Sequence, residues 1–461
     1  MNMAKYRKVL LALCLFTVGV CVHAQYLRTS YFMEGVSSRL QLNPALQPTN
    51  GYINIPVLGS FNIGASSNVL GTSDIIDILD SGEDLFSNDA LYNRLKTDNR
   101  LNVNLNTELL SFGWHRGKGF WSVNVGLRAD VGASIPKSMF EYMRDANGFS
   151  LTDGIQSYKI GNERFDLNAY AEVGVGYSRQ ITDKLTVGGR FNVLLGIARA
   201  EMEINRFDVE MDIPDVANAE NLRPEDWYGS NYSYNVQANL VTSYKGGGLD
   251  FDQNGYISGF DFGGGFGIAG TGFDIDLGAS YQIFDNLTVS AAVLDLGFIK
   301  WKDNVTTAAS VSEGESVIID QENYDKYIND DFLNLDRFNL RENNAAVQSS
   351  KTRLASTIVL AGEYGFFENK LAVGAIYTTR FVEPKTQNEL TFSATYRPKN
   401  WFNAAISYSP VQAGGKSLGL GSKLGSLFLG TDYMFFGNNS KSVNGFIGIS
   451  IPLGAKKSDV I

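Results

Sequence analysis

The sequence predicts an all-β chain that closes into a transmembrane antiparallel β-barrel. Apolar and polar residues alternate through residues 121–131 and 167–177, and the same two-residue period recurs in 273–283 and 443–453. Because successive side chains of a strand point to opposite faces, each segment has one apolar and one polar face. In a membrane barrel the apolar face meets lipid and the polar face lines the lumen.

The amino terminus predicts export. Basic residues precede an apolar run from Val9 to Val22, and a cleavage site follows before Gln25. The run is too short to span a membrane, so residues 1–24 are interpreted as a secretory signal peptide. Both cysteines lie within it, which leaves no disulfide in the mature chain. These features favour a barrel in the cell outer membrane over a secreted β-sandwich or β-helix.

The charge balance excludes one class of partner. The formal net charge is −10, and removal of the basic signal peptide would make the chain more acidic. Nucleic-acid partners select basic surfaces, so none is expected. The 48 glycines suit tight turns and crowded barrel walls, and the aromatic content of 12 % suits the two membrane interfaces.

Four parts are expected along the chain. After the signal peptide come a plug-like segment at 25–51, the barrel at 52–454 and a tail at 455–461. Connections alternate between short and long, as expected for brief periplasmic turns and long extracellular loops. These loops are predicted to carry short helices at 73–80, 84–96 and 137–145.

The predicted strand starts give about 14 strands. They lie near Tyr52, Leu101, Gly119, Asp166, Leu185, Thr271, Leu287, Thr352, Lys370, Asn388, Trp401, Lys416, Gly425 and Val443. A further transmembrane hairpin formed by 232–244 and 256–266 would give about 16 strands instead. Both numbers are even and keep the two termini in the periplasm, so strand parity does not choose between them.

Little in the chain points to catalysis. His115, the one histidine outside the signal peptide, lies in the predicted hairpin tip Trp114–Gly119. We interpret it as an exposed turn residue rather than half of a Ser–His pair. One histidine cannot build a histidine-rich zinc or iron site. No enzyme, no catalytic residue and no resident cofactor are therefore predicted, apart from the calcium considered next.

One segment has two interpretations, a calcium loop and an ordinary turn. It resembles the loops of EF-hand and dockerin-type repeats, with Gly255 at the sharp turn. The oxygen ligands would come from Asp250, Asp252, Asn254, the backbone of Tyr256, and Asp261. The last ligand is Asp rather than Glu, and flanking helices are missing from the pattern. Asp, Asn and Gly also favour ordinary turns, which keeps the second interpretation open.

Charged residues of both signs fall on the predicted lumen face. They are Glu108, Arg128, Asp130, Glu172, Arg190, Asp274, Asp276, Arg380 and Asp432. They predict either a network of ion pairs that braces the barrel or the lining of a solute path. Since neither sign dominates, the bracing network is the preferred interpretation.

Three stretches carry a family resemblance: Leu42–Ala45, Val293–Trp301 and Ser409–Tyr433. With them the chain resembles an uncharacterised outer-membrane barrel family of Bacteroidota, classed as a domain of unknown function. It is more distantly similar to the FadL-like long-chain fatty-acid transporters and to the shuttle barrel of type IX secretion. Both place an Asn-Pro-Ala element near the mature amino terminus. The resemblance assigns Asn43, Pro44 and Ala45 to a plug motif.

The resemblance implies a barrel that binds or passes hydrophobic or small solutes. The alternatives are a non-conducting barrel that docks a protein partner in secretion or surface assembly, and an outer-membrane hydrolase. Expected partners are outer-membrane lipid, a hydrophobic ligand and a periplasmic or surface protein. Gln25–Gly51 is too irregular to face lipid. The lumen is favoured for it over the periplasm, with Asn43 bonded to wall residues such as Arg128 or Glu172.

Overall fold

A computed structural model gives the fold of this chain. It describes residues 28–54, 60–71, 73–74, 88–146, 154–213, 223–261, 263–329, 339–347, 350–412, 414–433 and 440–455. The predicted signal peptide and nearly all of the predicted tail lie outside the described residues. So do residues 75–87, which hold most of the helix predicted at 73–80 and part of the one predicted at 84–96.

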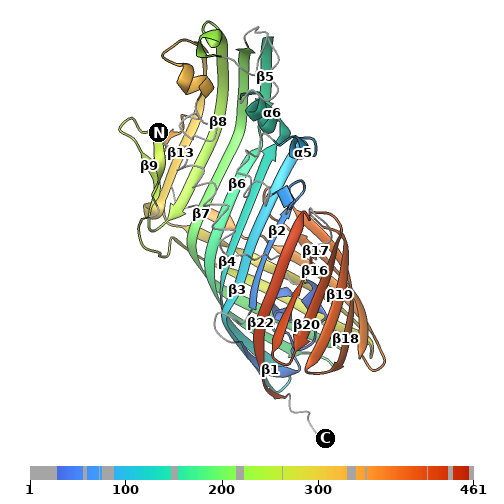
Figure 1. The fold of residues 1–461 in the computed structure, drawn as a ribbon. Helices are drawn as coiled ribbons and strands as arrows, with labels where there is room; N and C mark the ends of the chain where they lie inside the picture. Colours follow the sequence, from blue (N-terminus) through green and yellow to red (C-terminus); the bar gives the residue numbers. More distant parts are fainter. Residues whose placement is uncertain are drawn as a thin grey trace.

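The strands close into an antiparallel barrel of 14 strands (Figure 1). The first strand is in two pieces, β1 (Asn50–Asn54) and β2 (Ser60–Ser67). Both pieces pair with the last strand, β22 (Ser442–Ala455), on one side and with β3 (Asp98–Arg116) on the other. First and last strands therefore meet, and the sheet has no free edge at this seam.

Each remaining wall strand pairs with its neighbour in chain order. These strands are β4 (Gly119–Pro136), β6 (Glu163–Gln180), β7 (Leu185–Ile213), β11 (Gly270–Phe284), β12 (Leu287–Trp301), β15 (Lys351–Arg353), β16 (Thr357–Phe366), β17 (Leu371–Arg380), β18 (Gln387–Lys399), β19 (Phe402–Val411), β20 (Ser417–Leu424) and β21 (Leu427–Thr431). Because β15 and β16 both pair with β12, they occupy one position in the wall. The prediction of about 14 strands is confirmed.

The outer face of the barrel is apolar and its inner face is polar. On β6, Val175 is 48 % exposed on the outside, whereas Glu172 is 2 % exposed on the inside. Trp121 and Tyr177 lie on the same outer face, with ring centroids 4.6 Å apart near one end of their strands. The predicted two-residue alternation is therefore confirmed. Among the described residues, no helix is both long and apolar enough to cross a membrane.

At one end of the barrel several strands continue beyond the wall (Figure 1). This extension consists of the distal half of β7 with β5 (Gly154–Ile160), β8 (Asn231–Tyr244), β13 (Thr306–Ile318) and β14 (Arg341–Glu342). The two segments predicted as a further transmembrane hairpin lie here and not in the wall: 232–244 falls in β8, and 256–266 includes β10 (Ile257–Asp261). The 16-strand alternative is therefore wrong.

The apolar face of β7 changes its surroundings between the barrel and the extension. In the barrel, Phe191 is exposed on the outside and Asn192 is buried inside. Past a bulge between Ile204 and Arg206, the apolar Phe207 is buried in a protein core and Arg206 is exposed. An exposed apolar face suits hydrocarbon, whereas an apolar face covered by a protein core suits a part of the chain in water. The change marks the height at which the wall leaves its apolar belt.

The extension has a hydrophobic core of its own. Helix α6 (Lys137–Ala146) packs Met139, Phe140 and Met143 against the apolar faces of β7 and β8. This helix matches the one predicted at 137–145. The other short elements of the loops are α5 (Asp89–Tyr92), η2 (Pro224–Trp227), η3 (Asp303–Val305), η4 (Asp325–Asn329) and the hairpin of β9 (Gly248–Phe251) with β10.

Candidate functional site in the barrel lumen

Residues 28–49, termed here the N-terminal segment, lie inside the barrel. The segment holds two short helices, α2 (Arg28–Tyr31) and α3 (Arg39–Leu42), and most of its side chains are buried. It makes hydrogen bonds to side chains or backbone of β1, β11, β12, β17, β18 and β19. Contacts with strands spread around the wall fix it inside the lumen.

Arg28 anchors the beginning of the segment. Its guanidinium forms an ion pair of 2.7 Å with Glu389 of β18, and both side chains are 5 % exposed. The same guanidinium donates to the hydroxyl of Tyr433 at 2.8 Å. The backbone N–H groups of Arg28 and Thr29 donate to the carboxylate of Asp432 at 3.3 and 2.6 Å. Charged hydrogen bonds of this kind are among the strong ones in proteins.

Asn43 anchors the other end of the segment. Its side-chain amide donates to the backbone carbonyls of Ala279 on β11 and Ala291 on β12, both at 3.3 Å. Its side-chain oxygen accepts from the backbone N–H of Ala45 at 2.9 Å, which closes a local turn. Asn43 thus links the segment to wall backbone, and the predicted bonds to Arg128 or Glu172 are wrong.

The wall carries glycine where Pro44 approaches it. A Cβ at Gly278 would stand 2.9 Å from the ring Cδ of Pro44, and one at Gly188 would collide with the carbonyl of Pro44. A larger residue at either position would therefore push the segment away from β7 and β11. The close fit joins the Asn43–Ala45 motif to two glycines of the wall.

Apolar side chains of the segment pack on an apolar part of the inner wall. Tyr31, Phe32 and Leu42 form one cluster with wall residues of β12, β16 and β17. We call these wall residues the inner apolar stripe: Ala292, Leu294, Val359 and Ile376. Each is at most 4 % exposed. A second cluster joins Met33 and Val36 to Ala405, Phe428 and Phe446.

A network of charges fills the lumen beside the segment. Arg128 forms ion pairs with Glu172 at 2.8 Å and with Asp295 at 2.9 Å. Arg190 forms an ion pair with Asp276 at 2.7 Å. These residues come from β4, β6, β7, β11 and β12, so the network ties neighbouring strands together.

The other predicted lumen residues also lie inside. The Asn192 amide donates to Asp274 at 2.6 Å, and the Asn54 amide donates to Glu108 at 2.8 Å. Arg380 forms an ion pair of 2.6 Å with Asp130 across the barrel. With Asp432 at the Arg28 anchor, all nine predicted residues face the interior, and six of them form ion pairs with one another.

Sequence reasoning missed two important members of the interior. Asp295 shares the parity of the outward Val293, which predicts that it faces outward. A bulge with a φ of +57° at Asp295 turns it inward instead. Glu389 was also missed, although it shares the parity of Thr391, an inward position of β18 that the alternation identifies.

His115 does not lie at the hairpin tip. It belongs to β3, and its Nε2 lies 2.7 Å from the carbonyl oxygen of Pro48, with its ring 4.8 Å from that of Phe120. Gly117 and Lys118 form the turn instead. The histidine therefore contacts the end of the N-terminal segment, and the turn assignment is corrected.

The predicted calcium loop forms the β9–β10 hairpin. The Asp252 carboxylate accepts from the backbone N–H groups of Asn254 and Tyr256, each at 2.8 Å, across a turn in which Gly255 has a φ of +81°. Asp261 pairs with Gly248 at the far end of the hairpin. This geometry favours the turn, and calcium binding at the hairpin stays a prediction.

Comparison with protein families decides the membership of the chain. A family model described as a family of unknown function, DUF5723, matches residues 44–432. The chain belongs to this family. The membership confirms the resemblance to a family of unknown function, and the DUF5723 match begins at Pro44 of the predicted plug motif. No curated protein matches the chain.

Solved structures give distant likenesses. The Ralstonia pickettii toluene transporter TbuX is 10% identical, with a TM-score of 0.41 over 95% of this chain and 96% of that one. The P. putida toluene transporter TodX is 10% identical, with a TM-score of 0.39 over 93% and 98%. The translocator domain of autotransporter NalP from Neisseria meningitidis is 8% identical, with a TM-score of 0.33 over 91% and 92%. These values are too low to assign a substrate.

Proposed function

We propose that this DUF5723 protein is an outer-membrane barrel that binds or passes hydrophobic or small solutes, and that its N-terminal segment closes the lumen at rest. The apolar outer face fits lipid. The segment crosses the lumen between the Arg28 anchor and the Asn43 anchor. Passage of a solute requires that at least part of the segment moves.

The inner apolar stripe is the observation that carries this proposal. The lumen of a porin-like barrel is polar, because it holds water. Here Leu294, Val359 and Ile376 face inward and are covered by the segment. If the segment moves, this stripe becomes a surface on which an apolar solute gains free energy by leaving water. A polar solute gains no such free energy by binding to the same surface.

Uptake measurements test the proposal. Cells that express the protein should take up a radiolabelled aromatic hydrocarbon faster than cells without it, with no matching gain for a polar solute of similar size. Val359→Asn, which places an amide on the stripe, should reduce this uptake. Ser393→Asn, at an inward polar position of β18, should not.

Two results would contradict the proposal. No added uptake, together with a protein that co-purifies in fixed ratio with the barrel, would replace the proposal by the docking barrel. Equal uptake by Val359→Asn and the unaltered chain would remove the stripe from the path.

A further inference from the structure

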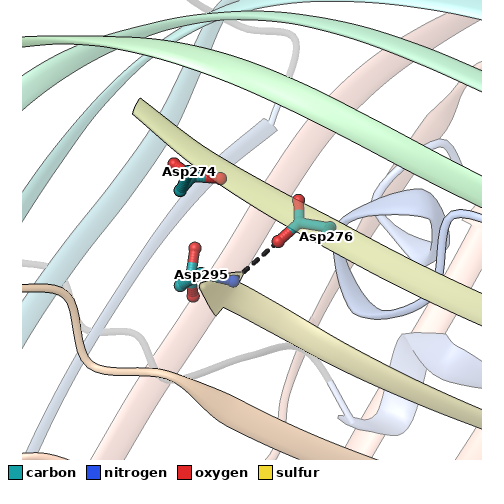
Figure 2. A group of neighbouring side chains, drawn as sticks. All are labelled: Asp274, Asp276 and Asp295. Carbon is teal, nitrogen blue, oxygen red and sulfur yellow. Dashed lines mark hydrogen bonds between the residues drawn. The ribbon is translucent and has the colours of Figure 1, made fainter. Parts of the chain in front are cut away.

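Three buried carboxylates meet in the lumen without enough positive charge. Figure 2 shows Asp274 and Asp276 on β11 and Asp295 at the bulge of β12. One oxygen from each lies within 4.8 Å of the others, and all three side chains are buried. Within the described part of the chain, they form the one such group of acidic, histidine or cysteine side chains.

The charges around this group do not balance. Ion pairs join Glu172 and Asp295 to Arg128, and Asp276 to Arg190, whereas Asp274 lies beside the carboxylates of Asp276 and Asp295. These four carboxylates and two guanidinium groups together carry two more negative than positive charges. Buried carboxylates that lack a counter-charge are costly, so the excess calls for bound protons or a bound cation.

Two unpartnered atoms point to a cation. The Oδ2 atom of Asp274, whose side chain is fully buried, has no hydrogen-bond partner among the described residues. The side-chain oxygen of Asn192, also fully buried, has none either. This oxygen and that of Asn124 both crowd the position that a Cβ on Gly174 would take. Two amide oxygens on one side of a glycine leave Asn192 in an unfavourable orientation.

We propose that Asp274, Asp276 and Asp295 bind one calcium ion. Turning the Asn192 amide over presents its oxygen to the carboxylates as a neutral fourth ligand, and its NH2 group then faces the Asn124 oxygen. Calcium takes several oxygen ligands at about 2.3–2.6 Å in flexible geometry, so two of its ligands can lie up to about 5 Å apart. The double charge of the ion matches the excess of the cluster.

The surroundings supply space for the remaining ligands. Asp295 and Arg128 line a cavity of about 30 Å³ together with Asp130, Tyr170 and Arg380. A cavity of this size holds water. Water on the side of Asp295 completes a calcium coordination sphere and gives the ion a polar route to the site. The site is separate from the β9–β10 hairpin.

Calorimetric titration of the folded full chain tests the site. The protein is treated with chelator in a non-ionic detergent and titrated with calcium chloride, and in parallel with magnesium chloride. One calcium ion per chain is expected. Asp274→Asn, which keeps the side-chain shape, should weaken calcium binding at least about tenfold. Asp208→Asn, in the exposed Arg206–Asp208 pair of the extension, should leave it unchanged.

Several results would overturn the proposal. They are no calcium binding by the unaltered chain, binding of magnesium alone, full affinity in Asp274→Asn, and loss of binding in Asp208→Asn. Folding of each variant is checked by the heat-dependent gel shift of an intact barrel. If Asp274→Asn lacks the folded band, Asp295→Asn provides the same test, and the titration of the unaltered chain is decisive without either variant.

Discussion

Arg28 and Glu389 form an ion pair of 2.7 Å inside the barrel, and it joins the N-terminal segment to β18. Glu389→Gln keeps the side-chain size but removes the carboxylate that pairs with Arg28. Removal of one partner of a buried ion pair costs about 3–5 kcal/mol. We expect this change to free the beginning of the segment, which limited proteolysis of the folded barrel would detect as new cleavage near Arg28.

The matched control for this prediction is Asp208→Asn. Asp208 pairs with Arg206 on the polar face of the extension, where the two side chains are 30 % and 50 % exposed. Exposed pairs contribute about 0–1 kcal/mol, so the cleavage pattern should stay unchanged. A Glu389→Gln protein as resistant as the unaltered chain would show that the ion pair does not hold the segment.

Gly188→Val is expected to displace Pro44. The added side chain collides with the Pro44 carbonyl, so the Asn43 end of the segment must leave the wall. Cells with this variant should become sensitive to a hydrophilic antibiotic that the outer membrane otherwise excludes. Gly445→Val is the control, because no atom lies within 4 Å of a Cβ at Gly445. Equal antibiotic sensitivity in both variants would show that the sensitivity does not come from displacement of Pro44.

Arginine on the outer face should destabilise the barrel. Val175→Arg is expected to cost about 2–4 kcal/mol near the bilayer midplane, and Val125→Arg and Ile449→Arg should behave alike. Urea titration of the protein folded in phospholipid vesicles measures this cost. Ser393→Thr, at an inward polar position of β18, should change little. A similar cost for the inner and outer changes would contradict the assigned faces.

A pH-dependent step is expected in the extension. Glu163 pairs with Ile204, above the apolar belt, and burial raises the pKa of Glu163 from 4.5 to about 8. A carboxyl group whose pKa rises on folding destabilises the fold as the pH rises from the lower value to the higher. Proteolysis of the extension should therefore be faster at pH 8 than at pH 4.5.

The control for this step removes the charge. Glu163→Gln has no group to ionise, so the added protease sensitivity at high pH should disappear. Protease activity itself varies with pH, and the rates are therefore compared with those for an unfolded reference peptide. An unchanged pH dependence in Glu163→Gln would assign the step to another group.

The barrel was predictable because alternation depends on local geometry alone. Val175 and Glu172 show opposite faces in the sequence itself, and the strand count follows from turns that separate such segments. The segment 232–244 produced the 16-strand alternative, because β8 has the same period although its apolar face is packed in a protein core. Hydrophobic period identifies a strand but not whether its apolar face meets lipid or a protein core.

The interior was only partly predictable. Asp130 and Arg380 were placed on the inner face by parity, but the two residues pair across the barrel from strands far apart in the sequence. The inward orientation of Asp295 could not be predicted, because a bulge reverses the alternation at one residue and leaves no clear pattern in the sequence. The Arg28–Glu389 pair spans almost the whole chain, so no local pattern could connect its two members.

Closure of the lumen by the N-terminal segment is the central claim, and single-channel recording tests it most directly. The unaltered chain and a chain lacking residues 28–49 are compared in planar bilayers, after both show the folded gel band. The account predicts a closed or rarely conducting barrel for the unaltered chain and a steady open conductance for the deletion. A steadily open unaltered chain, or a deletion that stays closed, would contradict it.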